Sequence, residues 1–253
     1  MEYKLMEPCH ASQVAEIHIE GQPGTFLTRL GRGFLTALYA EISRSPYGFG
    51  VVAMDGDQVV SVTVLSTSTP RLFADMKSRR ALRLILPILP QLLKHPPLLR
   101  DIWHTWRYPS KSSASNSPQP AERKQRVEAE FLFIGTRSAY RRQRIGMVMF
   151  DRGIAYAITR GVRQISAVVD QKNERMVNAF MEHGNKYGIL NHDDVFLFGR
   201  PMYRVIMNVD EDFFNHLEQH EAFAQEADWI LARVGSQATL SADTVHDPKP
   251  PVR

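Results

Sequence analysis

The chain has 253 residues, of which 43% are hydrophobic; this is enough for one globular domain with a buried core and excludes a chain that is disordered throughout. The single cysteine, Cys9, excludes an internal disulfide framework and a cysteine-based metal cluster, and no His and Cys spacing typical of a zinc site is present, so we expect no metal. The formal net charge is +4, but twelve Lys and Arg residues against three Asp and Glu residues lie between Arg71 and Arg126, so the basic character belongs to one segment.

Neither the N-terminal residues nor the most apolar run has the pattern of a membrane-targeting segment. The first five residues lack the basic and apolar regions of a signal peptide. The run Leu82–Leu93 is broken by Arg83, Pro87 and Pro90 and is shorter than the about 20 apolar residues that a transmembrane helix needs. We therefore expect a cytoplasmic protein.

The first third of the chain has the pattern of a strand, two helices and a β-hairpin. Val14 and Ile17, with His18, recur at helical spacing, and apolar residues recur at three and four positions in the stretch after Gly24. Asp55-Gly56-Asp57 suits the positive φ of a hairpin turn. The predicted elements are a strand over residues 3–6, helices over 11–17 and 26–42, and strands over 49–54 and 58–66.

An insertion over residues 70–125 interrupts this regular order. Its sequence predicts two basic amphipathic helices, Ser78–Leu93 and Pro97–Trp106. Residues 109–120 are dominated by Ser, Pro and Lys, which is typical of a flexible linker.

Regular structure resumes after residue 127 as a mixed strand and helix pattern. Met149, Phe150, Ile154 and Ala157 predict the buried face of a helix that ends at Gly161. The predicted elements are strands over 128–136 and 164–170, helices over 145–160 and from Asn173 to 182 or 183, and a final strand pair over 195–198 and 203–209. We expect one domain over 1–209, a C-terminal helix within 210–234, a disordered tail over 235–253, and an α/β (α+β) fold with a mixed central sheet flanked by helices.

The loop before the second-half helix carries the most informative chemistry. It lies between a predicted strand and a predicted helix, whose first N–H groups are unpaired and attract anions. Three arginines, Arg141, Arg142 and Arg144, add positive charge, and Gly146 lets a ligand approach the backbone. The pattern indicates a site for a diphosphate; a solvated basic loop before an ordinary helix is the alternative.

At this loop the chain resembles the GCN5-related N-acetyltransferases. Arg141-x-x-Arg144-x-Gly146 is similar to the family's (Arg/Gln)-x-x-Gly-x-(Gly/Ala) loop, and Asn173 through Gly184 is similar to its Asn-x-x-Ala-x-x-Phe-Tyr-x-x-x-Gly-Phe segment. The resemblance covers residues 3–209 apart from 70–125. It implies this family's mixed sheet, acetyl-CoA as co-substrate, and a strand before the loop that diverges from its neighbour to bind pantetheine.

The resemblance also implies which residues contact the cofactor. Three residues of the strand before the loop would bond pantetheine through their backbone, and the loop would hold the diphosphate. Two further residues would come from the predicted helix that begins at Asn173. These residues are Ile134, Gly135, Thr136, Arg141, Arg142, Gln143, Arg144, Ile145, Gly146, Met147, Asn173 and Phe180.

Three positions depart from the family's pattern. Arg144 replaces the first loop glycine, and an arginine at positive φ costs about 1 kcal/mol. Phe180 stands where a tyrosine is usual and supplies no hydroxyl as an acid, and Asn185 replaces an aromatic residue. Asn173 also has a simpler interpretation, as a helix cap.

In this family an amine attacks the thioester directly, so a base must take up its proton. Glu130, on the strand that leads to the loop, is the first candidate, although a strand glutamate can simply face solvent. Glu128 has the same parity and is the fallback. His183, Tyr187 and Tyr203 are weaker candidates for an acid or base.

Several partners stay open at this point. The acceptor is a small-molecule or peptide amine, and similar proteins are often homodimers. The insertion is either a helical flap over the acceptor side or a peripheral contact with an anionic membrane through residues 78–106. An acyl-CoA-binding module without turnover is the alternative function, and we expect no nucleic-acid partner because no such motif accompanies the basic segment.

Overall fold

The computed structural model describes residues 1–79, 81–94, 128–174, 176–178, 180–181, 190–197 and 200–208. Several predictions lie outside these residues. They concern the helix Pro97–Trp106, the linker 109–120, His183, Gly184, Asn185, Tyr187, the helix 210–234 and the tail 235–253.

In the described part of the chain, seven strands form one sheet in the order β1-β2-β3-β4-β5-β7-β6. Of the strand pairs described, β4 and β5 are parallel and the others are antiparallel. The predicted fold class, a mixed sheet flanked by helices, is confirmed. The strands are β1 Glu2–Leu5, β2 Gly48–Asp55, β3 Gln58–Ser66, β4 Glu128–Thr136, β5 Gln164–Asp170, β6 Leu190–Leu197 and β7 Arg200–Asn208.

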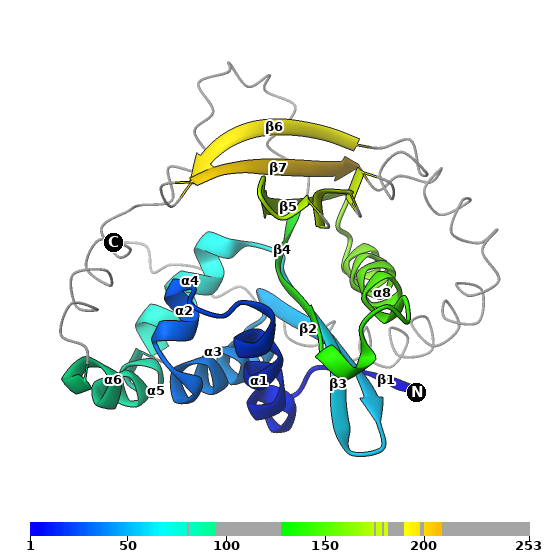
Figure 1. The fold of residues 1–253 in the computed structure, drawn as a ribbon. Coiled ribbons are helices and arrows are strands. Elements are labelled where there is room, and N and C mark those ends of the chain that lie inside the picture. The colour runs from blue at the N-terminus through cyan, green and yellow to red at the C-terminus, as the bar shows by residue number, and fades with distance from the viewer. Residues whose placement is uncertain are drawn as a thin grey trace, which may run out of the picture.

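Helices cover both faces of the sheet (Figure 1). One face carries α8, Ile145–Thr159, and residues 174, 176–178, 180 and 181, which we call the 174–181 helix. The other face carries the helices that precede β4, and each face has its own apolar core. Those helices are α1 Ala11–Gly21, α2 Phe26–Arg29, α3 Arg32–Arg44, α4 Thr69–Arg79, α5 Ala81–Ile85 and α6 Leu89–Lys94. No helix within the described ranges is long and apolar enough to cross a membrane.

A β-bulge in β4 directs its aromatic residues to opposite cores. Leu65 pairs with Phe131 and Val64 pairs with Phe133, so Leu132 is one residue too many in the ladder. Phe131 consequently stacks on Phe150 of α8, with ring centroids 4.8 Å apart. Phe133, two residues later, belongs to the core under α1 and α3. A regular strand would have placed both rings on one face.

Two stretches that were predicted as single continuous helices are interrupted in the structure. The stretch 26–42 is two helices, because Gly31 between them adopts φ +92°. The stretch Ser78–Leu93 contains the end of α4, then α5, a 3₁₀ turn over Leu86–Ile88 and α6. Pro87 and Pro90 supply no N–H to an α-helical ladder, which accounts for the interruptions.

Candidate active site and cofactor cleft

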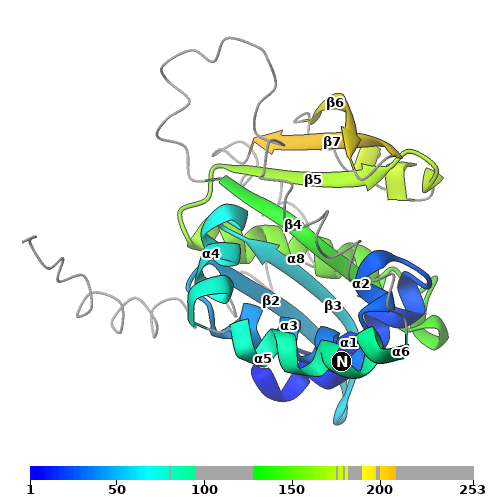
Figure 2. The same ribbon diagram turned by 90° about the vertical axis from the view of Figure 1, so that its left-hand side faces the viewer.

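β4 and β5 pair only along their first halves. Their register runs from Glu128 opposite Gln164 to Phe131 opposite Ala167, and among the described residues no further pair follows. Figure 2 shows the two strands diverging beyond this point. On its other edge β4 continues to pair with β3 as far as Thr136. Among the described residues, Ile134, Gly135 and Thr136 therefore have no strand partner on the edge toward β5, while the carbonyls of Gly135 and Thr136 accept side-chain hydrogen bonds from Ser61 and Arg141.

The loop after β4 turns sharply into α8 and leaves its first amides unpaired. Arg142 and Arg144 have φ of +68° and +59°, and Arg144 is the N-cap of α8. The N–H groups of Met147 and Val148 bond to the Arg144 carbonyl, at 3.0 and 3.2 Å. Within the described chain, the N–H groups of residues 142–146 have no backbone partner. Free N–H groups at the start of a helix are the feature on which the predicted diphosphate site depends.

Carboxylates of α1 hold this loop in place. Glu20 accepts a hydrogen bond from the Ser138 N–H at 2.5 Å and lies 3.6 Å from the Arg141 guanidinium. The hydrogen bonds from Ser138 lower the pKa of Glu20. Glu16 pairs with Arg137 at 2.9 Å. The sequence interpretation missed both carboxylates, since they lie more than 110 positions before the loop; the only available signal was two acidic residues on the polar face of α1.

Arg141 acts within the loop, while Arg142 and Arg144 are exposed. The Arg141 Nε–H donates to the Thr136 carbonyl at 3.1 Å, in addition to its contact with Glu20. Gln143 is exposed beside Arg142 and Arg144. The side chains open to a ligand are therefore those of residues 142–144, whereas Arg141 stabilises the turn. Ile145 is buried in the core of the α8 face and anchors the helix start.

The two candidate glycines have different surroundings. A Cβ on Gly146 would lie 3.5 Å from Thr136 Oγ1, an ordinary contact, so the protein itself does not require glycine there. A Cβ on Gly135 would come within 2.8 Å of Ile17 Cγ2 and 2.6 Å of Phe133 Cζ. Gly135 is therefore needed for β4 to pack against α1, and Gly146 leaves space in front of the loop.

Asn173 and Phe180, the two candidate residues from the helix after β5, have structural roles within the chain. Asn173 Oδ1 accepts a hydrogen bond from the Met176 N–H at 3.3 Å, which caps the helix. Phe180 is buried and meets Phe150 edge-on, with ring centroids 5.0 Å apart, and lies 6.4 Å from the Phe131 ring. Because Phe131 is the last β4 residue paired with β5, Phe180 packs beside the point at which the two strands begin to diverge.

Glu130 lies on the opposite face of β4 from α8. Its neighbours Ala129 and Phe131 belong to the core under α8, so the Glu130 side chain is directed to the side of α1–α4. There the Thr69 hydroxyl, at the start of α4, donates a 2.6 Å hydrogen bond to Glu130 Oε2. Glu128 has the same parity but is exposed at the outer end of the strand. The first helix of the insertion thus meets the candidate base.

His18 of α1 is buried on the same face of the sheet, against α3 and β4. Its Nδ1 lies 2.5 Å from the Tyr39 hydroxyl, and its ring stacks on Phe133 at 4.6 Å. Burial lowers the pKa of His18 to about 4 and raises the pKa of Tyr39. Helical spacing predicted the burial of His18, but nothing in the sequence indicated its partner on α3.

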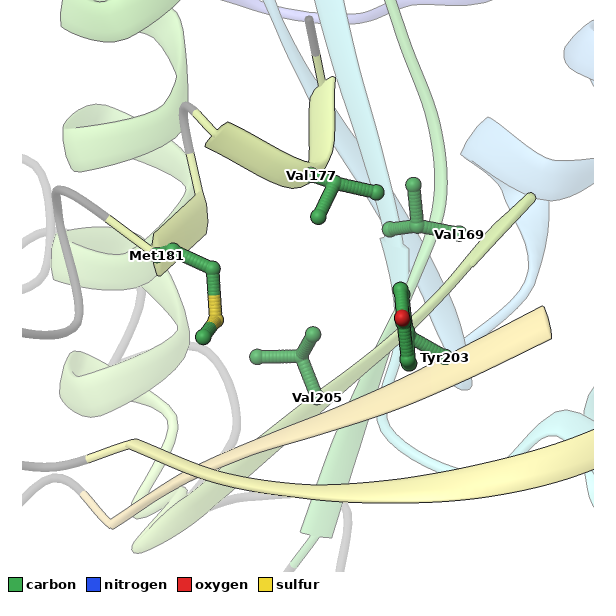
Figure 3. A pocket seen from close by; sticks show the side chains of 5 residues that line it. All are labelled: Val169, Val177, Met181, Tyr203 and Val205. Atoms are coloured by element: carbon green, nitrogen blue, oxygen red, sulfur yellow. The ribbon is translucent and has the colours of Figure 1, made fainter. Parts of the chain in front are cut away.

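A small apolar cavity of about 100 Å³ lies under the 174–181 helix (Figure 3). It is lined by Val169 of β5, Tyr203 and Val205 of β7, and Val177 and Met181 of the helix. No lining residue carries a charge, so the cavity offers nothing to bind a phosphate or an ammonium group. Tyr203, a weaker acid or base candidate, lies here and not beside Glu130.

Several solved acetyltransferase structures have a similar chain path. Arabidopsis thaliana NAA60 in complex with acetyl-CoA matches at 8% identity and a TM-score of 0.46, over 82% of this chain and 97% of that one. A putative GNAT-family acetyltransferase from Desulfovibrio desulfuricans matches at 10% identity and a TM-score of 0.49, over 83% of this chain and 98% of that one. The PaiA N-acetyltransferase of Thermoplasma acidophilum, in complex with coenzyme A, matches at 8% identity and a TM-score of 0.47, over 83% of this chain and 100% of that one.

These similarities concern the path of the chain and assign no activity to it, because the identities are 8–10% and the TM-scores are below 0.5. No family model and no curated protein matches the sequence.

Proposed function

We propose that this chain is an acetyl-CoA-dependent N-acetyltransferase of the GCN5-related kind, acting on an amine. The observation that carries the proposal is the divergence of β4 and β5 directly beside the unpaired amides of residues 142–146. A cleft with a free strand edge on one side and an anion site at its end matches an extended ligand with a diphosphate, as coenzyme A is. The resemblance of the loop sequence to that family supports the same assignment.

The cofactor would lie along the cleft in a single orientation, with its diphosphate at the loop. The diphosphate would accept hydrogen bonds from the N–H groups of residues 142–146, with the exposed Arg142 and Arg144 adding charge. Pantetheine would bond the free edge of Ile134–Thr136 in the manner of an added strand. Its thiol would then point toward the narrow end, where Phe180 and Phe131 meet.

The proposed reaction is direct transfer. The amine nitrogen attacks the thioester carbonyl, a C–N bond forms, and the C–S bond breaks to release the thiolate of coenzyme A. Glu130 would take up the amine proton, because it lies on the face of β4 that α8 does not cover. Phe180 cannot donate a proton to the leaving thiolate, so that proton would come from elsewhere.

The binding step can be tested with two substitutions at one position. Acetyl-CoA and CoA should raise the unfolding temperature and give a calorimetric binding isotherm, and ADP should do so more weakly. Gly146→Leu should abolish binding by filling the space before the amides, whereas Gly146→Ala, whose Cβ makes only an ordinary contact, should retain it. Unchanged binding by Gly146→Leu would contradict the proposed site.

Turnover needs a separate measurement. Thiol release from acetyl-CoA would be followed over polyamines, amino sugars, lysine and peptide N-termini, with Glu130→Gln as the matched variant. We expect Glu130→Gln to lower kcat about 100-fold or more and to leave acetyl-CoA binding intact. Binding without thiol release over the whole panel would instead indicate an acyl-CoA-binding module.

A further inference from the structure

The exposed apolar side chains of the protein are concentrated on the insertion. Among the described residues, the large hydrophobic side chains that are exposed are those of Met1 and of five residues between 73 and 89. Four of these five lie along α5, the 3₁₀ turn and α6, with 73% of Leu82, 38% of Ile85, 61% of Leu86 and 46% of Leu89 exposed. They are close together in the sequence and all exposed, so they form a short apolar row on the outside of this segment. We call these four residues the outer stripe.

The other side of the same segment is fixed against α3. Leu84 packs on the core of that face and Ile88 is buried. Gln91 lies so close to Gly31 that a Cβ there would be 2.9 Å from its Nε2. The Arg83 guanidinium pairs with the buried Glu41 of α3 at 3.2 Å. These contacts set the rotation of the segment, which lies on α3 at the outside of the helical layer (Figures 1 and 2), and they leave the outer stripe exposed.

Basic residues accompany the outer stripe. Between residues 71 and 94 the sequence has six Lys and Arg residues and one acidic residue, Asp75. Arg71, Lys77 and Arg83 are exposed. The rest of the chain has no net basic excess, because the whole protein carries only +4. The positive charge is thus concentrated where the apolar residues are exposed.

We propose that the outer stripe and its basic flanks dock the protein on an anionic lipid membrane. An apolar row inserts at the level of the headgroups, and nearby basic residues add electrostatic attraction to anionic lipid. A second copy of this chain fits less well. A symmetric dimer through the stripe would bring two faces with the same basic excess together, and like charges repel.

The test uses the whole chain and lipid vesicles without cofactor or acceptor, so its outcome is independent of the proposed function. Co-sedimentation would compare phosphatidylcholine vesicles with vesicles containing about one third phosphatidylserine, at low and at physiological salt. The stripe variant is Leu82→Glu/Leu86→Glu. The matched control is Lys172→Glu, which changes the net charge by the same amount at an exposed position on the turn after β5.

Wild type and the Lys172→Glu control should bind the anionic vesicles, and the stripe variant should lose at least about tenfold of its partition coefficient. Its unfolding temperature should stay close to that of the wild type, since both leucines are mostly exposed. Equal sedimentation with both vesicle types, or undiminished binding by the stripe variant, would overturn the proposal. Two further results would overturn the proposal if the wild type does not bind vesicles. One is a concentration-dependent dimer that the stripe variant abolishes. The other is a large loss of stability in the stripe variant.

Discussion

At the residue scale, Thr69 is positioned to control the candidate base. Its hydroxyl donates a hydrogen bond to Glu130 Oε2 and so fixes the orientation of that carboxylate. Thr69→Ala should therefore lower kcat about three- to tenfold and leave acetyl-CoA binding unchanged, because the base is no longer held in one position. Thr69→Ser, which keeps the hydroxyl, should restore kcat. A Thr69→Ala variant with the kcat of the wild type would show that this contact is only structural.

A substitution at Gly161 measures the cost of a left-handed backbone separately from any steric overlap of the new side chain. It follows α8 with φ +77°, and a Cβ there would meet nothing within 4 Å. Gly161→Ala should therefore destabilise the protein by about 1 kcal/mol through the left-handed backbone alone. Denaturant unfolding would measure this, with Gly21→Ala as control. Gly21 also has open space but no positive φ, so its substitution should be neutral or slightly stabilising. Equal losses for both would refute the strain explanation.

Arg144 shows what the sequence can and cannot indicate at a single residue. Its place in the glycine position of a known loop pattern predicted that its φ would matter, and φ is indeed +59°. The positive φ of Arg142 had no such signal, because the family's pattern leaves that position open. Contacts across the fold were equally invisible: Glu16 and Glu20 hold the loop from a helix that ends at residue 21.

At the scale of elements, the packing of β4 on α1 depends on one missing side chain. A Cβ on Gly135 would overlap the side chains of Ile17 and Phe133, which are both buried in the core under α1 and α3 and would have to shift to admit it. Gly135→Ala should therefore lower the free energy of unfolding by about 1–3 kcal/mol. Gly146→Ala, whose Cβ makes an ordinary contact in the same region, is the control and should cost less. A stable Gly135→Ala protein would mean that α1 can shift without loss.

Element boundaries were predictable where a local signal was strong. The strands Glu128–Thr136 and Gln164–Asp170 have the predicted ends, because alternating apolar residues end there at turns. The continuity of the stretch 26–42 was wrong, since its apolar spacing continues through Gly31 and only the backbone of that residue reveals the break. The bulge at Leu132 left no sequence signal either, because an apolar residue suits either face of a sheet buried on both sides.

At the scale of the whole molecule, the site is assembled from segments that the sequence keeps far apart. The loop of residues 141–146 was predictable because a strand, an anion-binding turn and a helix follow one another directly. Its partners on α1, and the contact of α4 with Glu130, depend on how the helices fold over the sheet. Local periodicity carries no information on that arrangement, so the order of strand, loop and helix was predictable and the contacts made across the sheet were not.

The buried His18 should couple the stability of the whole domain to pH. In the folded protein its pKa is about 4, whereas in the unfolded chain it is near 6.5. Between these values the unfolded state binds a proton that the folded state does not, so stability falls as pH decreases from 6.5 to 4. The slope from this one group is at most about 1.4 kcal/mol per pH unit. Above pH 6.5 the contribution is complete and constant.

The double variant His18→Leu/Tyr39→Phe isolates this effect. It removes the titrating ring together with the hydroxyl that would otherwise be left buried without a partner. Denaturant unfolding of both proteins from pH 4 to 8 gives the difference in free energy, in which the carboxylates common to both cancel. That difference should change by about 2–3 kcal/mol between pH 6.5 and 4 and be flat above. Parallel curves for the two proteins would mean that the core admits water to His18.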